Sequence, residues 1–396
     1  MDWKKVLFDL SGATASSAME YRAADAVRAL FEPYCDEIVT DALHNVLAIR
    51  HSKDKNAPTL LIDAHMDEIA MVITGVREDG FLNFDSLSGI DRRTILAAEV
   101  TVHAQNGDYY GIVSAVAPHL STEEDRKKTP AFDTLCIDVG YSGKAAAEIF
   151  STGDFVTLRQ RPTELLGSVV TGKSFDDRAS VTAILYALHE LHGAELPFHV
   201  CALLSAQEEP GLRGAKVGAY RIAPQEAIAI DVCHALIPEC PKERTSVMGK
   251  GPVLTYAPIL DRDMTDRLLE VAKERNIPCQ VEASVGTTGT NAYAIFATNY
   301  GVKTALNSIP LKYMHSAIET MDLQDMKNVD KRRCKVCNEG GNLLFIPRYA
   351  TGGAQRFDEL KHPSSPPSCP ACRPPAGRYP RRRPPRRSSS RRPAYS

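Results

Sequence analysis

The chain has 396 residues, a hydrophobic fraction of 43% and a formal net charge of -2. This length exceeds the usual size of a single hydrophobic core, so we expect two domains and an appendage. No apolar run reaches the roughly 18 residues of a membrane span, and the N-terminus lacks a secretory signal pattern, so we expect a cytoplasmic protein with no membrane partner.

The first 330 residues show an α/β pattern with an interruption. Residues 15–30 have a helical pattern, and residues 43–49 and 59–64 have strand patterns. From about 72 to 163, short alternating segments separated by turn signals predict a small β-rich, barrel-like domain. Helix and strand patterns then return, with helices expected at 178–192 and 265–275 and strands ending near 208, 231 and 308. We therefore predict a discontinuous domain, residues 1–71 and 164–330, interrupted by an insert, residues 72–163.

The charge is divided unevenly along the chain. Residues 331–396 contain 16 Lys and Arg, 3 Asp and Glu, and 11 of the 25 prolines. Residues 1–330 contain the other 31 basic and 46 acidic residues, which gives them a net charge of -15 against +13 for the rest. A segment with so many prolines and like charges cannot bury a core, so we predict that residues 331–396 form a disordered basic tail.

Three apolar, strand-like runs end on residues suited to a divalent metal. These runs are residues 59–65, 199–209 and 228–231. Because the carboxyl ends of strands form the ligand crevice of open α/β sheets, residues far apart in sequence can meet there. The resulting mixture of imidazoles and carboxylates suits two divalent metals that share a site. The candidate residues are His65, Asp67, Asp176, Asp177, Glu208, Glu209, Asp231 and His315.

Each candidate also has an ordinary explanation when taken singly. His65 and Asp67 point to the same side of an extended strand, so Asp67 can orient a metal-bound His65, but such pairs are more often surface hydrogen bonds. Glu208 and Glu209 supply either a general base and a ligand or a solvated loop. Two aspartates before a helix are equally typical of an acidic helix start. The joint occurrence of these features favours the metal site.

Five segments carry a resemblance to a known family. They are HMDE at 65–68, GKSFDDR at 172–178, AQEEPG at 206–211, ID at 230–231 and YMHS at 313–316. In order and spacing they resemble the tetrahedral, TET-type aminopeptidases, which include glutamyl, lysyl and deblocking aminopeptidases of the co-catalytic metallopeptidase clan. The resemblance covers residues 1 to about 329. It implies a mixed-sheet hydrolase that removes N-terminal residues from short peptides by attack of a water activated by two metals.

The resemblance also implies a role for each matching residue. Asp176 would bridge both metals, with Glu209 and His315 completing one site and His65 and Asp231 the other. Glu208 would be the general base, and Asp67 would orient His65. The peptide between the two aspartates is typically cis in this clan. Asn291 stands where the family usually has aspartate.

The resemblance further implies a cofactor and an assembly. Two divalent ions per subunit are expected, with zinc the leading candidate, although cobalt and manganese also suit mixed imidazole and carboxylate ligands. The insert would be a dimerisation domain, and the dimers would build a hollow dodecamer that admits short peptides. No single residue identifies which N-terminal residue is removed.

The basic tail supports an alternative function. It contains Cys334-x-x-Cys337 and Cys369-x-x-Cys372, formally a four-thiolate zinc pattern. The 31 residues between the two pairs exceed the usual spacing of roughly 15 to 20, so a disordered basic extension or a shifted reading frame competes with a zinc module. A nucleic-acid-associated or zinc-binding protein would act through this tail by phosphate contacts. The acidity of residues 1–330 and their complete ligand set favour the aminopeptidase and make a nucleic-acid partner the weaker hypothesis.

Overall fold

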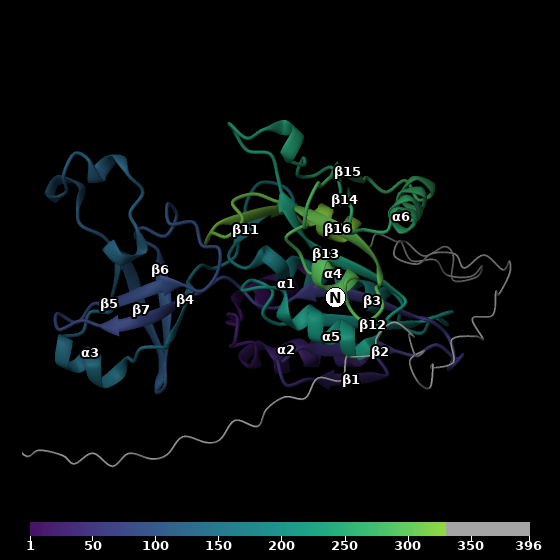
Figure 1. Cartoon of the computed structure of the whole chain (residues 1–396), viewed down its shortest axis with the longest axis horizontal. Coiled ribbons are helices and arrows are strands. Elements are labelled where there is room, and N and C mark those ends of the chain that lie inside the picture. The colour runs from purple at the N-terminus through teal and green to yellow at the C-terminus, as the bar shows by residue number, and fades with distance from the viewer. Residues whose placement is uncertain (330–396) are drawn as a thin grey trace, which may run out of the picture. The chain divides into compact units, whose positions relative to one another are not determined.

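The computed structural model describes residues 1–329 (Figure 1). The predictions for residues 331–396, including the two Cys-x-x-Cys pairs, lie outside the described residues. Within residues 1–329 no helix is both long enough and apolar enough to cross a membrane.

An eight-stranded mixed sheet forms the centre of the fold, in the order β1-β2-β12-β3-β13-β16-β14-β15. Strands β12 and β13 both run parallel to β3, and β16 runs parallel to β13. Figure 1 labels these strands close together in the central fold. Their carboxyl ends therefore meet at one edge of the sheet. The strands are β1 Glu37–Thr40, β2 Val46–Arg50, β3 Thr59–His65, β12 His199–Ser205, β13 Glu226–His234, β14 Val253–Tyr256, β15 Gln280–Ala283 and β16 Lys303–Leu311.

Helices cover both faces of this sheet. Alternate residues of β3 show this, because Leu60 and Ile62 belong to one core cluster with α1, α2 and α4, whereas Leu61 belongs to another with α5 and α7. Burial on both faces explains why the parallel strands are almost continuously apolar in sequence. The mixed α/β fold predicted from the sequence is thus confirmed. The helices are α1 Trp3–Gly12, α2 Tyr21–Phe31, α4 Phe175–Glu190, α5 Arg213–Ile222, α6 Arg262–Glu274, α7 Ala292–Phe296 and α8 Leu323–Asn328.

The helix predicted from residue 15 is wrong in its first six residues, because α2 begins at Tyr21. Residues 15–20 instead form a loop in which Ala18 has a φ of 70°. The backbone of this loop bonds to the chain beyond β3, where the Glu68 amide donates to the Ala15 carbonyl at 3.0 Å. Tertiary contacts therefore override the local helical pattern.

The β-rich insert is a closed six-stranded barrel in the order β4-β5-β8-β7-β6-β9. Its interior is a separate apolar cluster that includes Ile73, Phe84, Val102 and Val156. The barrel comprises β4 Met71–Val76, β5 Leu82–Ser86, β6 Glu99–Ala104, β7 Gly107–Ser114, β8 Cys136–Asp138 and β9 Phe155–Leu158, with the helix α3 Gly143–Ile149.

A further small sheet lies after the barrel in sequence, in the order β10-β11-β17. It pairs β10 (Thr163–Glu164) and β11 (Val169–Gly172), which follow the barrel, with β17 (Glu319–Asp322), which precedes α8. This pairing was not predicted from the sequence.

Polar contacts tie the barrel to the central fold. The Arg22 guanidinium on α2 donates to both carboxylate oxygens of Asp108 on β7, at 2.9 and 2.8 Å. His103, buried on β6, bonds to the same carboxylate at 2.8 Å and to the Thr157 hydroxyl at 2.9 Å. These contacts hold α2 and the barrel against each other.

Candidate active site

The predicted site residues meet at the carboxyl edge of the central sheet. His65 ends β3 and Glu209 follows β12, whereas Asp231 lies within β13, which continues three residues beyond the predicted strand end to His234. Two groups offer metal-ligand atoms that all lie within 4.8 Å of one another: His65 with Asp177 and Asp231, and His65 with Asp176 and Glu209. His315, in the loop after β16, adds its Nε2 atom 3.4 Å from Asp176 and 3.5 Å from Glu209.

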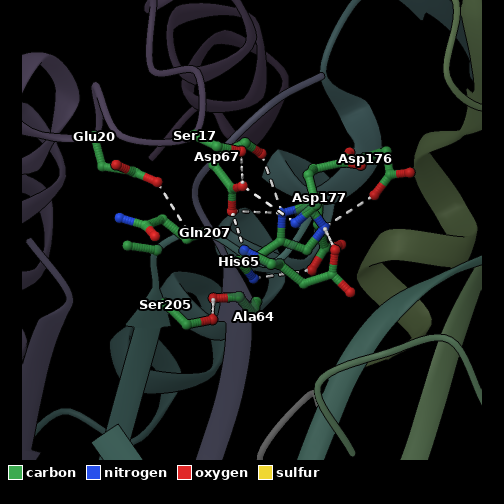
Figure 2. Close-up of polar contacts among 12 residues, drawn as sticks. Ser17, Glu20, Ala64, His65, Asp67, Asp176, Asp177, Ser205 and Gln207 are labelled. Carbon is green, nitrogen blue, oxygen red and sulfur yellow. Dashed lines mark hydrogen bonds and ion pairs between the residues drawn. The ribbon is translucent and has the colours of Figure 1, made fainter. Parts of the chain in front are cut away.

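His65 lies at the centre of these residues and is almost fully buried (Figure 2). Its Nε2 atom faces carboxylates, 3.1 Å from Asp176 and 4.0 Å from Glu208. Its Nδ1 atom lies 3.1 Å from the Asp67 carbonyl oxygen and 3.4 Å from the Asp67 carboxylate. Burial acts to lower the pKa of His65, but Glu208, Asp176 and Asp67 outweigh it and raise the pKa well above 6.5.

Asp176 presents its two carboxylate oxygens to two different imidazoles. Oδ1 is 3.1 Å from Nε2 of His65, and Oδ2 is 3.4 Å from Nε2 of His315. Burial alone would raise the pKa of Asp176, but the two histidines lower it below the ordinary value. The Asp176–Asp177 peptide bond is cis. Neither residue has helical dihedral angles, so the regular part of α4 begins at Arg178, as the sequence predicted.

Glu319 is a site residue that the sequence reasoning missed. Its carboxylate accepts the Asp176 amide at 3.1 Å and the His315 amide at 3.0 Å. It is 1% exposed, and burial followed by the Asp176 charge raises its pKa well above 4.5. Glu319 starts the short strand β17, and nothing in its local sequence pattern distinguishes it from a surface glutamate. Only the pairing of β17 with β11 brings it to the site.

The loop of residues 206–209 is held by side chains at every backbone amide. Successive amides donate to Asn45 at 2.8 Å, to Glu20 at 2.8 Å, and to the two carboxylate oxygens of Asp67 at 2.9 and 3.2 Å. Figure 2 shows Glu20 beside Gln207, and Asp67 between Ser17 and His65. Asp67 therefore contacts both the His65 imidazole and the loop that carries Glu208 and Glu209. Its bonds to the loop, and the contributions of Glu20, Asn45 and Ser17, were not predicted from the sequence.

Ser17 supports Asp67 from the loop before α2, where its hydroxyl donates to Asp67 Oδ2 at 2.5 Å. Ser17→Ala is expected to lower the free energy of unfolding by about 1.5–3 kcal/mol, the range for a buried hydrogen bond to a charged group. Urea unfolding measures this loss of stability. We also expect Ser17→Ala to have a lower kcat than the unaltered chain while its metal content stays the same. Ser16→Ala is the matched control, because the Ser16 hydroxyl is buried without a partner among the described residues. Equal losses in both variants contradict the role of Ser17.

The carboxylates outnumber the cations in this site. Burial first, and then neighbouring charges, raise the pKa of Glu208 to about 9, of Glu209 to about 8 and of Asp231 to about 7. The nearby buried cations are engaged elsewhere, since Lys173 pairs with Glu68 and the Arg178 guanidinium donates to the Leu10 carbonyl at 2.8 Å.

The donor set fits divalent cations. Two imidazoles and several carboxylates are the ligands expected for such ions, and the ions would offset the crowded negative charge. Oδ1 of Asp177 is also buried without a hydrogen-bond partner in the described part of the chain. The residues present are therefore consistent with a site for more than one metal.

A cleft of about 510 Å³ opens beside these residues. His65, Asp176 and Glu208 line one side of it. The rest of the lining extends along the sheet to β15 and combines apolar and hydroxyl side chains with a few charged ones. It includes Cys233, Arg244, Thr255, Glu282, Leu306, Ser308 and Met314.

Several known proteins are similar to this chain in sequence and in fold. A family model described as M42 glutamyl aminopeptidase matches residues 44–331. A lysyl aminopeptidase from Pyrococcus furiosus is 33% identical over 352 residues, which cover 88% of this chain and 100% of that protein.

Two solved structures extend the likeness to three dimensions. An aminopeptidase from the archaeon Desulfurococcus kamchatkensis has a TM-score of 0.77 and 32% identity, covering 82% of this chain and 91% of that one. The TET1 peptidase of Pyrococcus horikoshii, which can assemble into a tetrahedron or a large octahedral shell, has a TM-score of 0.74 and 31% identity, covering 82% and 96%. The chain therefore belongs to the M42 glutamyl aminopeptidase family, and within it to the TET-type peptidases that its motifs indicated.

Proposed function

We propose that this chain is a metal-dependent aminopeptidase that releases N-terminal residues from short peptides, with Glu208 as its general base. The position of Glu208 is the observation that carries the proposal. It borders the cleft, its backbone amide is fixed by Asp67, and its carboxylate lies 4.0 Å from Nε2 of His65. Among the described residues, none donates a hydrogen bond to the Glu208 carboxylate, so this carboxylate is free to accept a proton.

The proposed metal ligands follow from which atoms face one another. Asp176 would bridge two ions because its oxygens face different imidazoles. Glu209 and His315 would complete one site, and His65 and Asp231 the other. Asp177 is a competing ligand for the second site, since it shares a compact group with His65 and Asp231. Zinc is the leading candidate, and cobalt or manganese would suit the same ligands.

The chain's own residues would each perform one task in hydrolysis. When bound, the ions supply Lewis-acid polarisation of the scissile carbonyl and acidify water. Glu208 would accept the proton of the attacking water and pass it to the leaving amine. Asp67 would keep His65 in one orientation throughout.

Metal removal tests the proposed function. We expect the chelated protein to lose hydrolysis of aminoacyl chromogenic substrates, and the addition of zinc, cobalt or manganese to restore it with about two ions per chain by metal analysis. An N-acetylated copy of a cleaved peptide is the substrate control and should resist hydrolysis. Full activity in protein shown to be free of metal, or cleavage of the blocked peptide at internal bonds, contradicts the proposal.

We further propose that the barrel mediates dimerisation and that the dimers build a dodecamer. The barrel segment exposes apolar side chains to solvent, including Leu96 at 40%, Tyr110 at 46% and Ile112 at 40%. Adjoining exposed apolar groups commonly mark a protein interface. The assembly of the Pyrococcus horikoshii TET1 peptidase into large shells supports the proposal.

Light scattering tests the assembly. The unaltered chain should give the mass of a multiple of dimers, and Ile112→Glu should lower that mass by placing a charge in the interface. Leu166→Glu is the control, because Leu166 is 93% exposed and lies in the turn between β10 and β11, outside the barrel. That variant should remain at least dimeric. A strictly monomeric unaltered chain that is active on large folded proteins contradicts the assembly.

A further inference from the structure

The cleft follows one face of the central sheet from the candidate metal ligands to the edge strand β15. Asp231 on β13 is in register with Ser308 on β16, which is in register with Val253 on β14. Two residues further along β14, Thr255 is in register with Glu282 on β15. Partners in register and residues two apart on a strand share a face, so Asp231, Ser308, Thr255 and Glu282 all lie on the same face. All four line the cleft.

Glu282 brings a negative charge to the far wall without a cation to balance it. The Thr255 hydroxyl donates to Glu282 Oε1 at 2.8 Å and holds the carboxylate on the cleft side. None of the ion pairs within 4.0 Å among the described residues involves Glu282. The side chain is half-buried. The carboxylate therefore presents a negative charge to the cleft that a cationic group of a bound substrate could pair with.

Cys233, His234 and Arg244 also line the cleft, and none of them forms an ion pair with Glu282 among the described residues. Cys233 has a thiol, which carries no positive charge in either protonation state, and the His234 side chain is exposed to solvent. Arg244 also lines the cleft, but it is exposed and forms no ion pair in the described part of the chain. Water solvates an exposed guanidinium at little cost, so Arg244 has no comparable need of a partner.

We propose, resting on the aminopeptidase function above, that Glu282 selects substrates whose N-terminal residue is lysine or arginine. Strands in a sheet are about 4.8 Å apart, so three spacings place β15 about 14 Å from β13. A lysine ammonium lies about 6 Å from its Cα atom and a glutamate carboxylate about 3–4 Å from its own, by standard bond lengths. Together they span most of the distance between a peptide held near Asp231 and the edge strand.

The rest of the wall suits a long side chain with a charged end. Leu306 and Met314 also line the cleft and offer apolar contact to an alkyl stem. A short side chain would leave Glu282 uncompensated, and an acidic one would be repelled by it. The selected class is therefore a long cationic residue rather than a small or acidic one.

Kinetics of Glu282→Gln on lysyl, arginyl, leucyl and glutamyl chromogenic substrates, with the full metal-loaded chain, test the inference. Glutamine keeps the shape and the bond from Thr255 but removes the charge. The ratio of kcat/KM for the lysyl over the leucyl substrate should fall about 10- to 100-fold, because the cationic group loses the carboxylate that faces it from β15. Glu243→Gln is the matched control, since it removes the same charge from an exposed residue outside the cleft lining and should leave the ratio within about twofold.

The possible outcomes separate the inference from the function on which it rests. If leucyl substrate is cleaved but the lysyl-to-leucyl ratio is the same in Glu282→Gln and in the unaltered chain, the inference is overturned and the aminopeptidase function stands. A preference for glutamyl substrate that depends on Arg244 overturns it as well. If the metal-loaded chain releases no amino acid from any of the four substrates, the proposed function itself fails, and the inference fails with it.

Discussion

Glu208→Gln is expected to lower kcat by about 10² to 10⁴ while both the fold and the bound metals are kept. The amide cannot accept the proton of the attacking water, but it has nearly the size of the carboxylate. The backbone of Glu208 is also held independently of its side chain, by the bond from its amide to Asp67 at 2.9 Å. Steady-state kinetics, metal analysis and thermal unfolding of the same preparation measure the three quantities together.

Glu209→Gln is the informative comparison, because the two residues are adjacent and lose the same charge. Glu209 lies 3.5 Å from Nε2 of His315 and within one compact group of ligand atoms with His65 and Asp176. Its variant should therefore lose metal as well as rate. Near-normal turnover in Glu208→Gln would remove Glu208 from the role of base, and loss of metal in that variant would recast it as a ligand.

The sequence predicted the parts of the site that lie at strand ends. His65, Glu209 and Asp231 each stand at the end of an apolar run in the sequence. Because β3, β12 and β13 pair in parallel, these three residues lie at the same edge of the sheet. This part of the site could be predicted from strand periodicity and from the rule that ligands bind at the carboxyl ends of such strands. The β-rich insert was equally visible, because turn signals interrupt its strands at short intervals.

The residues that hold the site in place were not predictable in the same way. Glu20, Ser17 and Glu319 each act through one or two hydrogen bonds, most of them to segments far apart in sequence, such as the bond from the Gln207 amide to Glu20 at 2.8 Å. A buried carboxylate that accepts one distant amide has no periodic signature. The helical pattern over residues 15–20 even predicted the wrong local structure, since contacts with Glu68 and Asp67 fix this segment as a loop. Local patterns report which face is buried, but not which partner a polar group finds.

The strand pattern in the sequence does not show which of Asp176 and Asp177 bridges the metals, because both residues lie just before the regular part of α4 and neither ends a strand. The structure separates their contacts. Asp176 faces two imidazoles, whereas Asp177 accepts only the His65 amide, at 3.3 Å, and leaves its other oxygen without a partner among the described residues. A carboxylate between two imidazoles suits a bridging ligand, and one beside a single imidazole suits a ligand to one ion or a positioning group.

Asp176→Asn is therefore expected to affect both ions, unlike Glu208→Gln. An amide offers one weak oxygen in place of two charged ones, so metal content should fall below two per chain after dialysis. Affinity should drop at least about 100-fold, since even residues that only support ligands are worth 10–100-fold. Plasma mass spectrometry of dialysed protein, and unfolding midpoints with and without added metal, measure this apart from the loss of rate.

Asp177→Asn decides the assignment, because it removes the adjacent charge and keeps the size of the side chain. If Asp176 is the bridge, Asp177→Asn should retain at least one ion, and metal should still raise its unfolding midpoint, because a ligand that binds only the folded state stabilises it. The reverse pattern, two ions in Asp176→Asn and none in Asp177→Asn, would transfer the bridge to Asp177. In that case the contacts of Asp176 with His65 and His315 would serve to position the two imidazoles rather than to join two metals.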